Sequence, residues 1–113
     1  MGFQEMITER ERADAARREE LWAEARRAGD ALRQQGASRV VVFGSLARGE
    51  AGRHSDLDLL VVWETSLGRW ERLDAAWKAI KPRVAVDLLV VTPAELDGLS
   101  AFGEQVLKEG VEV

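Results

Sequence analysis

VVVFGS at residues 40–45, followed after ten intervening residues by DLD at residues 56–58, is the stretch that decides how this chain folds. The first part is an apolar run that ends in a glycine and a serine, and the second part opens another apolar run that continues to residue 63. Short runs rich in valine and leucine and bounded by glycine or aspartate are typical of buried β-strands. The pattern therefore predicts strands over 39–43 and 57–63, with a glycine turn and two carboxylates where the sheet meets its loops.

The remaining segments alternate between helical and extended patterns. Thr8 and Glu11 have the spacing of a capping box, and Gly36 is a suitable stop, so a long helix is expected between them. A helix over 69–80, a third strand over 84–91, a helix starting at Thr92 and an edge strand over 111–113 complete the predicted elements. We therefore predict an α/β (α+β) fold with a short mixed β-sheet flanked by helices. One domain over 1–113 is expected, with an N-terminal helix (1–36), a core (37–91) and a C-terminal helix and tail (92–113).

The long N-terminal helix has two unlike halves. Its second half carries an apolar stripe and is expected to pack on the domain, whereas its first half offers only alanines and is expected to project. The stripe consists of Leu21, Ala25, Ala28 and Leu32. In the first half, Asp14 is spaced to pair with Arg10 and Arg18 along the helix. That half is either a solvated face or a docking surface.

Composition limits the classes of protein that need to be considered. The chain has 113 residues, of which 46% are hydrophobic and 32% charged, which fits a globular protein with a core. No apolar run reaches the ~20 residues of a membrane span, and no signal peptide is recognisable, so a cytoplasmic protein is expected. The formal net charge of −4 argues against a general nucleic-acid binder. With no cysteine, disulfides and thiolate metal sites are excluded.

Three aspartates indicate a site for divalent cations. Asp56 and Asp58 are two residues apart on a predicted strand, so their side chains point the same way. Asp87 lies within the apolar run 84–91, where a lone ionised carboxylate would be costly unless it were paired or coordinated. Oxygen ligands without histidine or cysteine favour Mg²⁺ or Mn²⁺ over zinc. The alternative is that Asp87 pairs with an arginine such as Arg83 or Arg39.

The glycine turn indicates a binding place for phosphate. A turn at Gly44-Ser45 that leads from a strand into a helical segment presents free N–H groups to an anion, and Arg48 either contacts the same phosphate or is an exposed loop residue. A P-loop is excluded, because Glu50-Ala51 stands where lysine and serine or threonine are required. His54 is expected to face solvent and Ser55 to be a turn residue. The four tryptophans are expected to fill the core, unless one anchors a partner; they are Trp22, Trp63, Trp70 and Trp77.

The stretch FGSLARGE at residues 43–50, together with SDLDL at 55–59 and the later Asp87, resembles the polymerase-beta-like nucleotidyltransferase superfamily, and within it the minimal nucleotidyltransferases (MNT). The resemblance covers roughly 37–91. It implies that Gly44 and Ser45 hold a triphosphate and that Asp56, Asp58 and Asp87 bind Mg²⁺ and are the catalytic residues. ATP is the implied nucleotide donor.

The same resemblance implies a biological role. Many MNT proteins are antitoxins of HEPN-domain ribonuclease toxins, and some silence the toxin by transferring AMP from ATP to one of its tyrosines. This chain contains no tyrosine, so such an acceptor would belong to another molecule, and a hetero-oligomer is the implied assembly. Two alternatives stay open: an antitoxin that neutralises by binding alone, and a nucleotidyltransferase that acts on a small molecule.

Overall fold

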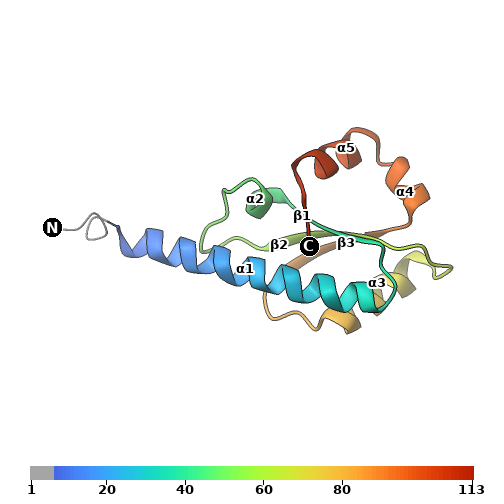
Figure 1. The fold of residues 1–113 in the computed structure, drawn as a ribbon, viewed down its shortest axis with the longest axis horizontal. Helices are drawn as coiled ribbons and strands as arrows, with labels where there is room; N and C mark the ends of the chain where they lie inside the picture. The colour runs from blue at the N-terminus through green and yellow to red at the C-terminus, as the bar shows by residue number, and fades with distance from the viewer. Residues whose placement is uncertain (1–6) are drawn as a thin grey trace.

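The structure is a computed structural model that describes residues 7–113. Helices and strands alternate along most of the chain, as Figure 1 shows. In chain order they are α1 (Glu9–Gln34), β1 (Arg39–Phe43), α2 (Gly44–Ala47), β2 (Leu57–Val62), α3 (Arg69–Ile80), β3 (Val86–Val91), α4 (Pro93–Asp97), α5 (Ser100–Glu109) and β4 (Val111–Glu112).

The strands form one mixed sheet in the order β3-β2-β1-β4. β1 pairs antiparallel with both β2 and β4, whereas β2 and β3 run parallel. β2 is therefore an inner strand, as expected from a sequence that is apolar on both of its faces. β3 needs a crossover to run parallel to β2, and helix α3 provides it. The predicted mixed sheet with flanking helices is confirmed.

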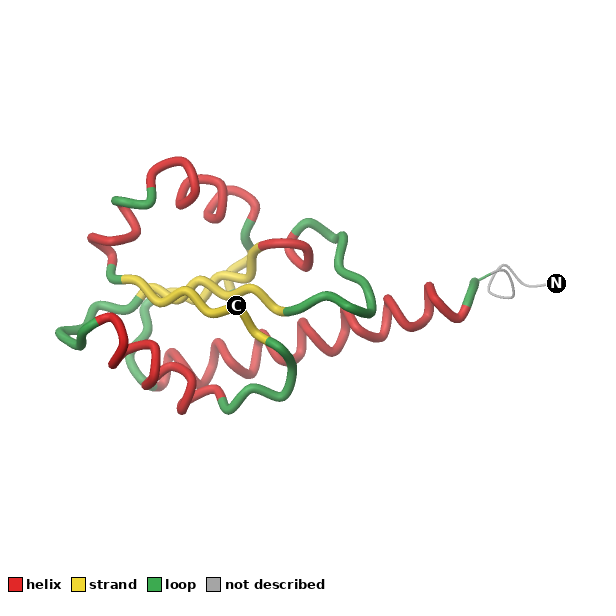
Figure 2. Tube along the Cα trace, turned by 180° about the vertical axis from the view of Figure 1, so that it is seen from behind, coloured by secondary structure: helices red, strands yellow, loops and turns green. Residues whose placement is uncertain are grey.

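Helices lie on both faces of this sheet (Figure 2). On one face, alternate residues of β2, Leu57, Leu59 and Val61, pack in a core that includes residues of α1 and α3. On the other face, Leu60 and Val62 join a smaller cluster that extends to α4 and α5. Because side chains alternate along a strand, Asp58 lies on this second face together with Leu60 and Val62.

Local capping explains where α1 begins and ends. The Thr8 hydroxyl accepts a hydrogen bond from the Glu11 amide, as the sequence predicts for its N-cap. At the other end, Gly36 has a φ of 110°, its amide donates to Arg33, and the Ala37 amide donates to Leu32. This is a Schellman motif, which requires the left-handed conformation that glycine adopts most easily. The buried residues of α1 begin at Leu21, so its second half carries the core contacts, as predicted.

Several expectations about the periphery are wrong in detail. β3 begins at Val86 and not at residue 84, and β2 ends one residue before Trp63. The expected single C-terminal helix is two helices, because the chain turns after α4 and Ser100 has a φ of 52°. Thr92 does cap α4 in a complete capping box with Glu95.

The tryptophans do not share one environment. Trp63 is buried, and Trp22 and Trp77 are partly buried against the main core, but the Trp70 side chain is 76% exposed. Trp70 lies in the first turn of α3, where it lines a surface cavity, seven residues before Trp77 on the same helix. The expectation that all four fill the core is therefore wrong for Trp70. In residues 7–113 no helix has both the length and the apolar character needed to cross a bilayer.

Candidate active site

The strand register places two of the three predicted acids side by side. Phe43 of β1 is opposite Asp58 of β2, and Asp58 is opposite Asp87 of β3. The three side chains form a row across neighbouring strands on the face that α4 and α5 partly cover. Adjacent strands are ~4.8 Å apart, so in-register carboxylates are direct neighbours. Asp87 therefore lies on the same side of the sheet as Asp58.

The closeness of these carboxylates affects the ionisation of Asp58. Burial, followed by the charge of Asp87 and a hydrogen bond with it, raises the pKa of Asp58 above its ordinary 3.8. The charge of Asp56 raises this pKa further, while Arg48 acts in the opposite direction. Neighbouring carboxylates that disfavour the ionised form of Asp58 create a negative site, which a cation would stabilise.

The donor set fits a hard divalent cation. Asp58 and Asp87 are direct neighbours in the strand register, and the charge of Asp56 also acts on Asp58. Across residues 7–113, no three histidine, cysteine, aspartate or glutamate side chains converge closely enough to enclose an ion by themselves. This agrees with the way in which Mg²⁺ is usually held, by one or two carboxylates together with substrate phosphates and water. Asp56 is exposed directly before β2.

Gly44 brings the turn against the acid. α2 begins at Gly44, directly after β1, and its φ of 72° lies in the left-handed region that favours glycine. A Cβ at this position would overlap the Oδ2 atom of Asp58. The turn therefore approaches the carboxylate as closely as it does because residue 44 has no side chain. Ser45 follows in the first turn of α2, where backbone N–H groups have no acceptor within the helix.

Arg48 closes this end of the site. It caps α2, and its guanidinium forms an ion pair of 3.1 Å with Glu50. It also lines a cavity of about 210 Å³ beside Phe43 and Gly44, whose opposite wall is formed by residues of α5. The α5 side includes Phe102, whose ring meets that of Phe43 edge-on at 6.1 Å. Arg48 is thus both exposed and adjacent to the turn.

Comparison with known proteins identifies this arrangement. The sequence pattern of the nucleotidyltransferase domain matches residues 25–112. The chain belongs to the nucleotidyltransferase domain family. Its chemistry is accordingly nucleotidyl transfer, its substrate is a nucleotide, and domains of this family generally use a divalent metal such as Mg²⁺.

Two solved structures are similar to this chain. A crystal structure from Sulfolobus solfataricus, described as a candidate nucleotidyltransferase, is 24% identical over 83% of this chain and 82% of its own, with a TM-score of 0.58, and shows a common fold. A second structure, described as a candidate minimal nucleotidyltransferase, is 37% identical over 86% of this chain and 89% of its own, with a TM-score of 0.47. No functionally curated protein matches the chain.

One premise about Asp87 needs correction in this nucleotidyltransferase domain. The apolar run around it predicts a buried carboxylate that needs a counter-charge. Instead, β3 is an edge strand and Asp87 is exposed, so there is no large burial cost to offset. No ion pair joins Asp87 to Arg83, Arg39 or any other arginine of the described chain. Its closeness to Asp58 follows from the strand register and not from burial.

The segment that leads to Asp56 is tied to α1, which the sequence does not predict. His54 is exposed and the Ser55 hydroxyl accepts a bond of 2.9 Å from the Gly52 amide, both as expected. However, the Asp14 carboxylate accepts from the Arg53 amide and side chain instead of pairing along its helix with Arg10. Arg17 and Arg18 also bind carbonyls of this segment; their i, i+3, i+4 spacing with Asp14 is the signal that could have revealed a common face.

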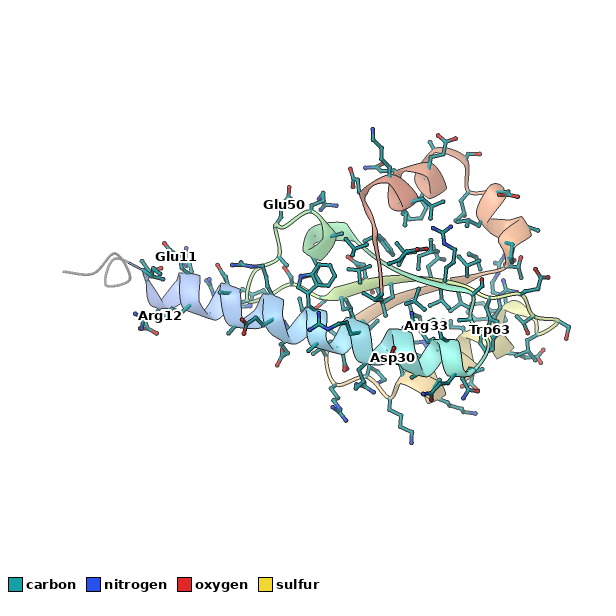
Figure 3. All side chains as sticks on the ribbon, viewed as in Figure 1. Glu11, Arg12, Asp30, Arg33, Glu50 and Trp63 are labelled. Carbon is teal, nitrogen blue, oxygen red and sulfur yellow. The ribbon has the colours of Figure 1, made fainter. Side chains whose placement is uncertain are left out.

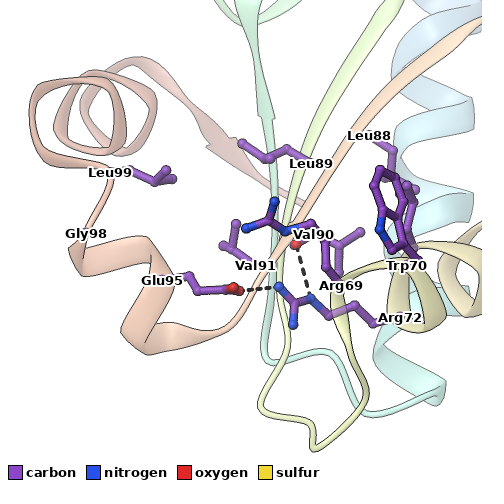
Figure 4. Close-up of a pocket in the computed structure, with 11 residues that line it drawn as sticks. Arg69, Trp70, Arg72, Leu88, Leu89, Val90, Val91, Glu95, Gly98 and Leu99 are labelled. Atoms are coloured by element: carbon purple, nitrogen blue, oxygen red, sulfur yellow. Dashed lines mark hydrogen bonds and ion pairs between the residues drawn. The ribbon is translucent and has the colours of Figure 1, made fainter.

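Another cavity, of about 410 Å³, lies away from the acids (Figure 4). It is at the far end of β3, between α3 and α4, and its lining includes Trp70, Val90 and Leu99 but none of the three aspartates. There the buried guanidinium of Arg72 donates to the Val90 carbonyl at 3.4 Å and pairs with Glu95. The Glu95 carboxylate also accepts a hydrogen bond from the Thr92 amide, and the bonds with Arg72 and Thr92 together lower the pKa of Glu95 to about 2. The cavity is a separate surface feature.

Proposed function

We propose that this chain transfers AMP from ATP to a hydroxyl group of another molecule, with Mg²⁺ held by Asp56, Asp58 and Asp87. The observation that carries the proposal is the row of Asp58 and Asp87 in register, with Gly44 packed directly against Asp58. The turn supplies hydrogen-bond donors for phosphate, and the acids supply negative charge for cations, in adjoining positions. A nucleoside triphosphate with its metal matches both features.

The residues divide the work as follows. The amides of Gly44 and Ser45 hold the β and γ phosphates, and Arg48 adds a positive charge beside them. When bound, Mg²⁺ would neutralise the charge that develops on the α phosphate and the leaving group. The carboxylates of Asp56 and Asp58 orient that end of the nucleotide. Fixed positions for both reactants account for much of the expected rate enhancement.

The bond changes are those of a single displacement. The acceptor oxygen forms a bond to the α phosphorus, the bond from that phosphorus to the oxygen bridging to the β phosphate breaks, and pyrophosphate leaves. The acceptor hydroxyl loses its proton, and Asp87 is the proposed recipient. Because Asp87 is exposed at the edge of the sheet, a hydroxyl on a large partner can reach it.

The proposed acceptor is a tyrosine of a HEPN-domain toxin, which would make the chain an antitoxin in the cytoplasm. Membership of the nucleotidyltransferase family supports the transfer, and the resemblance to MNT proteins supports this acceptor. The chain itself has no tyrosine, so self-modification at that residue type is excluded. An exposed acid at a sheet edge is compatible with a protein acceptor.

Neutralisation by binding alone is a second candidate, which a separate observation favours. Trp70 is 76% exposed beside the 410 Å³ cavity, and a tryptophan in such a position is a suitable anchor for a protein partner. This function would not need the aspartates.

Labelled ATP distinguishes the two functions. The chain is incubated with Mg²⁺, ATP labelled at the α phosphate, and a candidate HEPN-domain partner. Label is expected on a tyrosine of the partner with the wild-type chain and not with Asp58→Ala. Neutralisation by binding alone would be favoured if the Asp56→Ala, Asp58→Ala double variant still neutralises the partner and neither this variant nor the wild-type chain transfers label. A wild-type chain that transfers no label to any candidate acceptor would contradict the proposed activity.

A further inference from the structure

We infer that the first half of α1 is a positioning device for the active site. Asp14, Arg17 and Arg18, here called the loop clamp, hold the segment 51–55 and thereby set the direction of Asp56. The inference rests on the proposed function, because it takes Asp56 to be a cation ligand.

The loop clamp contacts the segment along its whole length. Nε and Nη2 of Arg17 both donate to the Ser55 carbonyl, each at 3.1 Å. Nη1 of Arg18 donates to the Ala51 carbonyl at 3.1 Å, and Oδ1 of Asp14 accepts from the Arg53 amide at 2.8 Å. The three helix residues thus bind the backbone at the first, third and fifth positions of the segment, and Asp14 also contacts the Arg53 side chain.

These bonds fix the peptide units on either side of Asp56. On one side, the Ser55 carbonyl is held by the two donors of Arg17. On the other side, the Leu57 amide donates to the Ala85 carbonyl at 3.0 Å, where the sheet begins. With both neighbouring peptide planes held, the φ and ψ angles of Asp56 are restricted, and so is the direction of its Cβ. Asp56 is exposed, so little side-chain packing is present to do this instead.

The first half of α1 has no other evident function in the fold. Its side chains from Glu9 to Glu20 are exposed or half-buried, and the fully buried positions begin at Leu21. Figure 3 shows that Glu11 and Arg12 lie on the part of the helix that extends past the sheet. The match to the nucleotidyltransferase domain starts at residue 25, so the loop clamp is outside it. The clamp therefore gives a reason for the length of α1 that core packing does not.

The charges of the clamp suit its contacts. Hydrogen bonding by the Arg53 amide, together with the charges of Arg53 and Arg18, keeps the pKa of Asp14 below its ordinary value. Arg17 is also paired with Glu20 on its own helix, which leaves its guanidinium oriented toward the segment. Each bond to the segment backbone joins one charged side chain to a neutral peptide group, and such charge-assisted hydrogen bonds are stronger than neutral ones.

The test uses the full chain and compares Arg17→Ala with Arg12→Ala. Arg12 is the matched control, because it is an arginine of the same helix that pairs with Glu9 and does not contact the segment. Three quantities are measured: hydrogen exchange of the amides of 51–57, Mn²⁺ affinity by electron paramagnetic resonance, and the Mn²⁺ dependence of AMP transfer. Arg17→Lys, which keeps the charge and offers one donor group, tests for rescue.

For Arg17→Ala we expect faster exchange in 51–57 and Mn²⁺ binding that is roughly tenfold weaker, the low end of what loss of an outer-shell partner causes. Transfer should recover at saturating Mn²⁺, so that the metal requirement rises while kcat is restored. Arg17→Lys should fall between Arg17→Ala and wild type, and Arg12→Ala should behave as wild type. Asp14→Ala, which frees the Arg53 amide, provides a second test and should change the same quantities in the same direction.

The possible outcomes distinguish failure of the positioning role from failure of the proposed function. If the segment loosens in Arg17→Ala and Asp14→Ala while Mn²⁺ affinity stays at the wild-type value, the positioning role is wrong and the proposed function is unaffected. If wild type shows no Mn²⁺ binding that depends on Asp58, the proposed function fails, and the positioning role fails with it.

Discussion

The two faces of β2 are built from alternate residues of one six-residue strand, yet they serve different ends. Leu57, Leu59 and Val61 on one face are completely buried under α1 and α3. The opposite face starts with Asp58, which is half-buried and in contact with Asp87, and becomes apolar only at Leu60. The first face maximises apolar burial, whereas the start of the second concentrates negative charge that burial disfavours. Consecutive residues of β2 thus serve different purposes: one side chain contributes to the core and the next to the candidate site.

Removing the charge of Asp58 should have the largest effect on activity. Asp58→Asn keeps the size of the side chain but removes the carboxylate that lies beside Asp87 in the strand register. We expect AMP transfer to fall by more than roughly a hundredfold, beyond the loss typical of outer-shell residues. Steady-state transfer assays at saturating Mg²⁺ check this, with folding monitored by circular dichroism. Activity near wild type would show that this face is not the catalytic one.

Leu59→Ala tests the opposite face of β2, where it truncates a core side chain. Leu59 is fully buried, so its truncation should reduce the free energy of unfolding by about 2–5 kcal/mol. Urea denaturation measures this loss. Transfer per folded molecule should stay at the wild-type level, because the Leu59 side chain faces away from the acids. A selective loss of kcat in a chain that remains folded would mean that the two faces are coupled.

Gly44→Ala tests the close approach of the turn to Asp58. The new Cβ would displace the Asp58 carboxylate, and we expect transfer to decrease roughly 10- to 100-fold. The control is Gly49→Ala: Gly49 has a φ of 75°, close to that of Gly44, but a Cβ there meets no atom within 4 Å. Both substitutions introduce left-handed strain of about 1–2 kcal/mol. Equal losses of activity in the two variants would attribute the effect to strain alone.

The pH dependence of stability gives a smaller but specific effect. The pKa of Asp58 is raised in the folded state, so folding favours its protonated form. Its favourable contribution is complete below its ordinary pKa of 3.8 and disappears as the pH rises through the raised value. In the absence of divalent metal, Asp58→Asn should therefore be more stable than wild type at neutral pH, and the difference should vanish below pH 3.8. Urea unfolding of both proteins with chelator present measures this, and a difference that grows toward acid pH would have the wrong sign.

Trp70 marks a surface that neither face of β2 explains. Because the side chain is 76% exposed, Trp70→Ala should change the free energy of unfolding by less than about 0.5 kcal/mol. Trp63→Ala, at a site that is 8% exposed, should reduce the free energy of unfolding by about 3–5 kcal/mol. Urea denaturation of both variants measures these changes. If Trp70→Ala leaves nucleotide binding intact but abolishes binding of the proposed protein partner, the surface around Trp70 is the partner surface. Loss of stability comparable to that of Trp63→Ala would contradict the exposed position.

The sequence predicts the local features of the fold and site well because they depend on short-range rules. Alternation along β2 identifies an inner strand with two acids at its start, and the glycine-serine turn is placed correctly after β1. The nucleotidyltransferase assignment follows from the same residues. The roles of Asp56, Asp58, Asp87, Gly44, Ser45 and Arg48, and the organisation of 1–113 as one domain, stay predictions.

What the sequence does not reveal depends on contacts between distant segments. The apolar run around Asp87 predicts a buried carboxylate, and only the strand order shows that β3 is at the edge of the sheet and that its acid is exposed. Trp70 and Trp77 have the spacing of one helix face, but only Trp77 packs against the main core, and Trp70 is exposed. The partners of Asp14 and Arg17 lie about 40 positions along the chain, beyond the reach of helical spacing rules.

The central claim is that Asp58 and Asp87 hold a cation while the Gly44-Ser45 turn holds the triphosphate of the same nucleotide. A crystal structure of the chain with Mn²⁺ and a non-hydrolysable ATP analogue tests this directly through anomalous scattering. We predict a manganese peak between the carboxylates of Asp58 and Asp87, with β and γ phosphate oxygens on the amides of Gly44 and Ser45. Nucleotide bound elsewhere, such as beside Trp70, with no metal on either aspartate, would contradict the account.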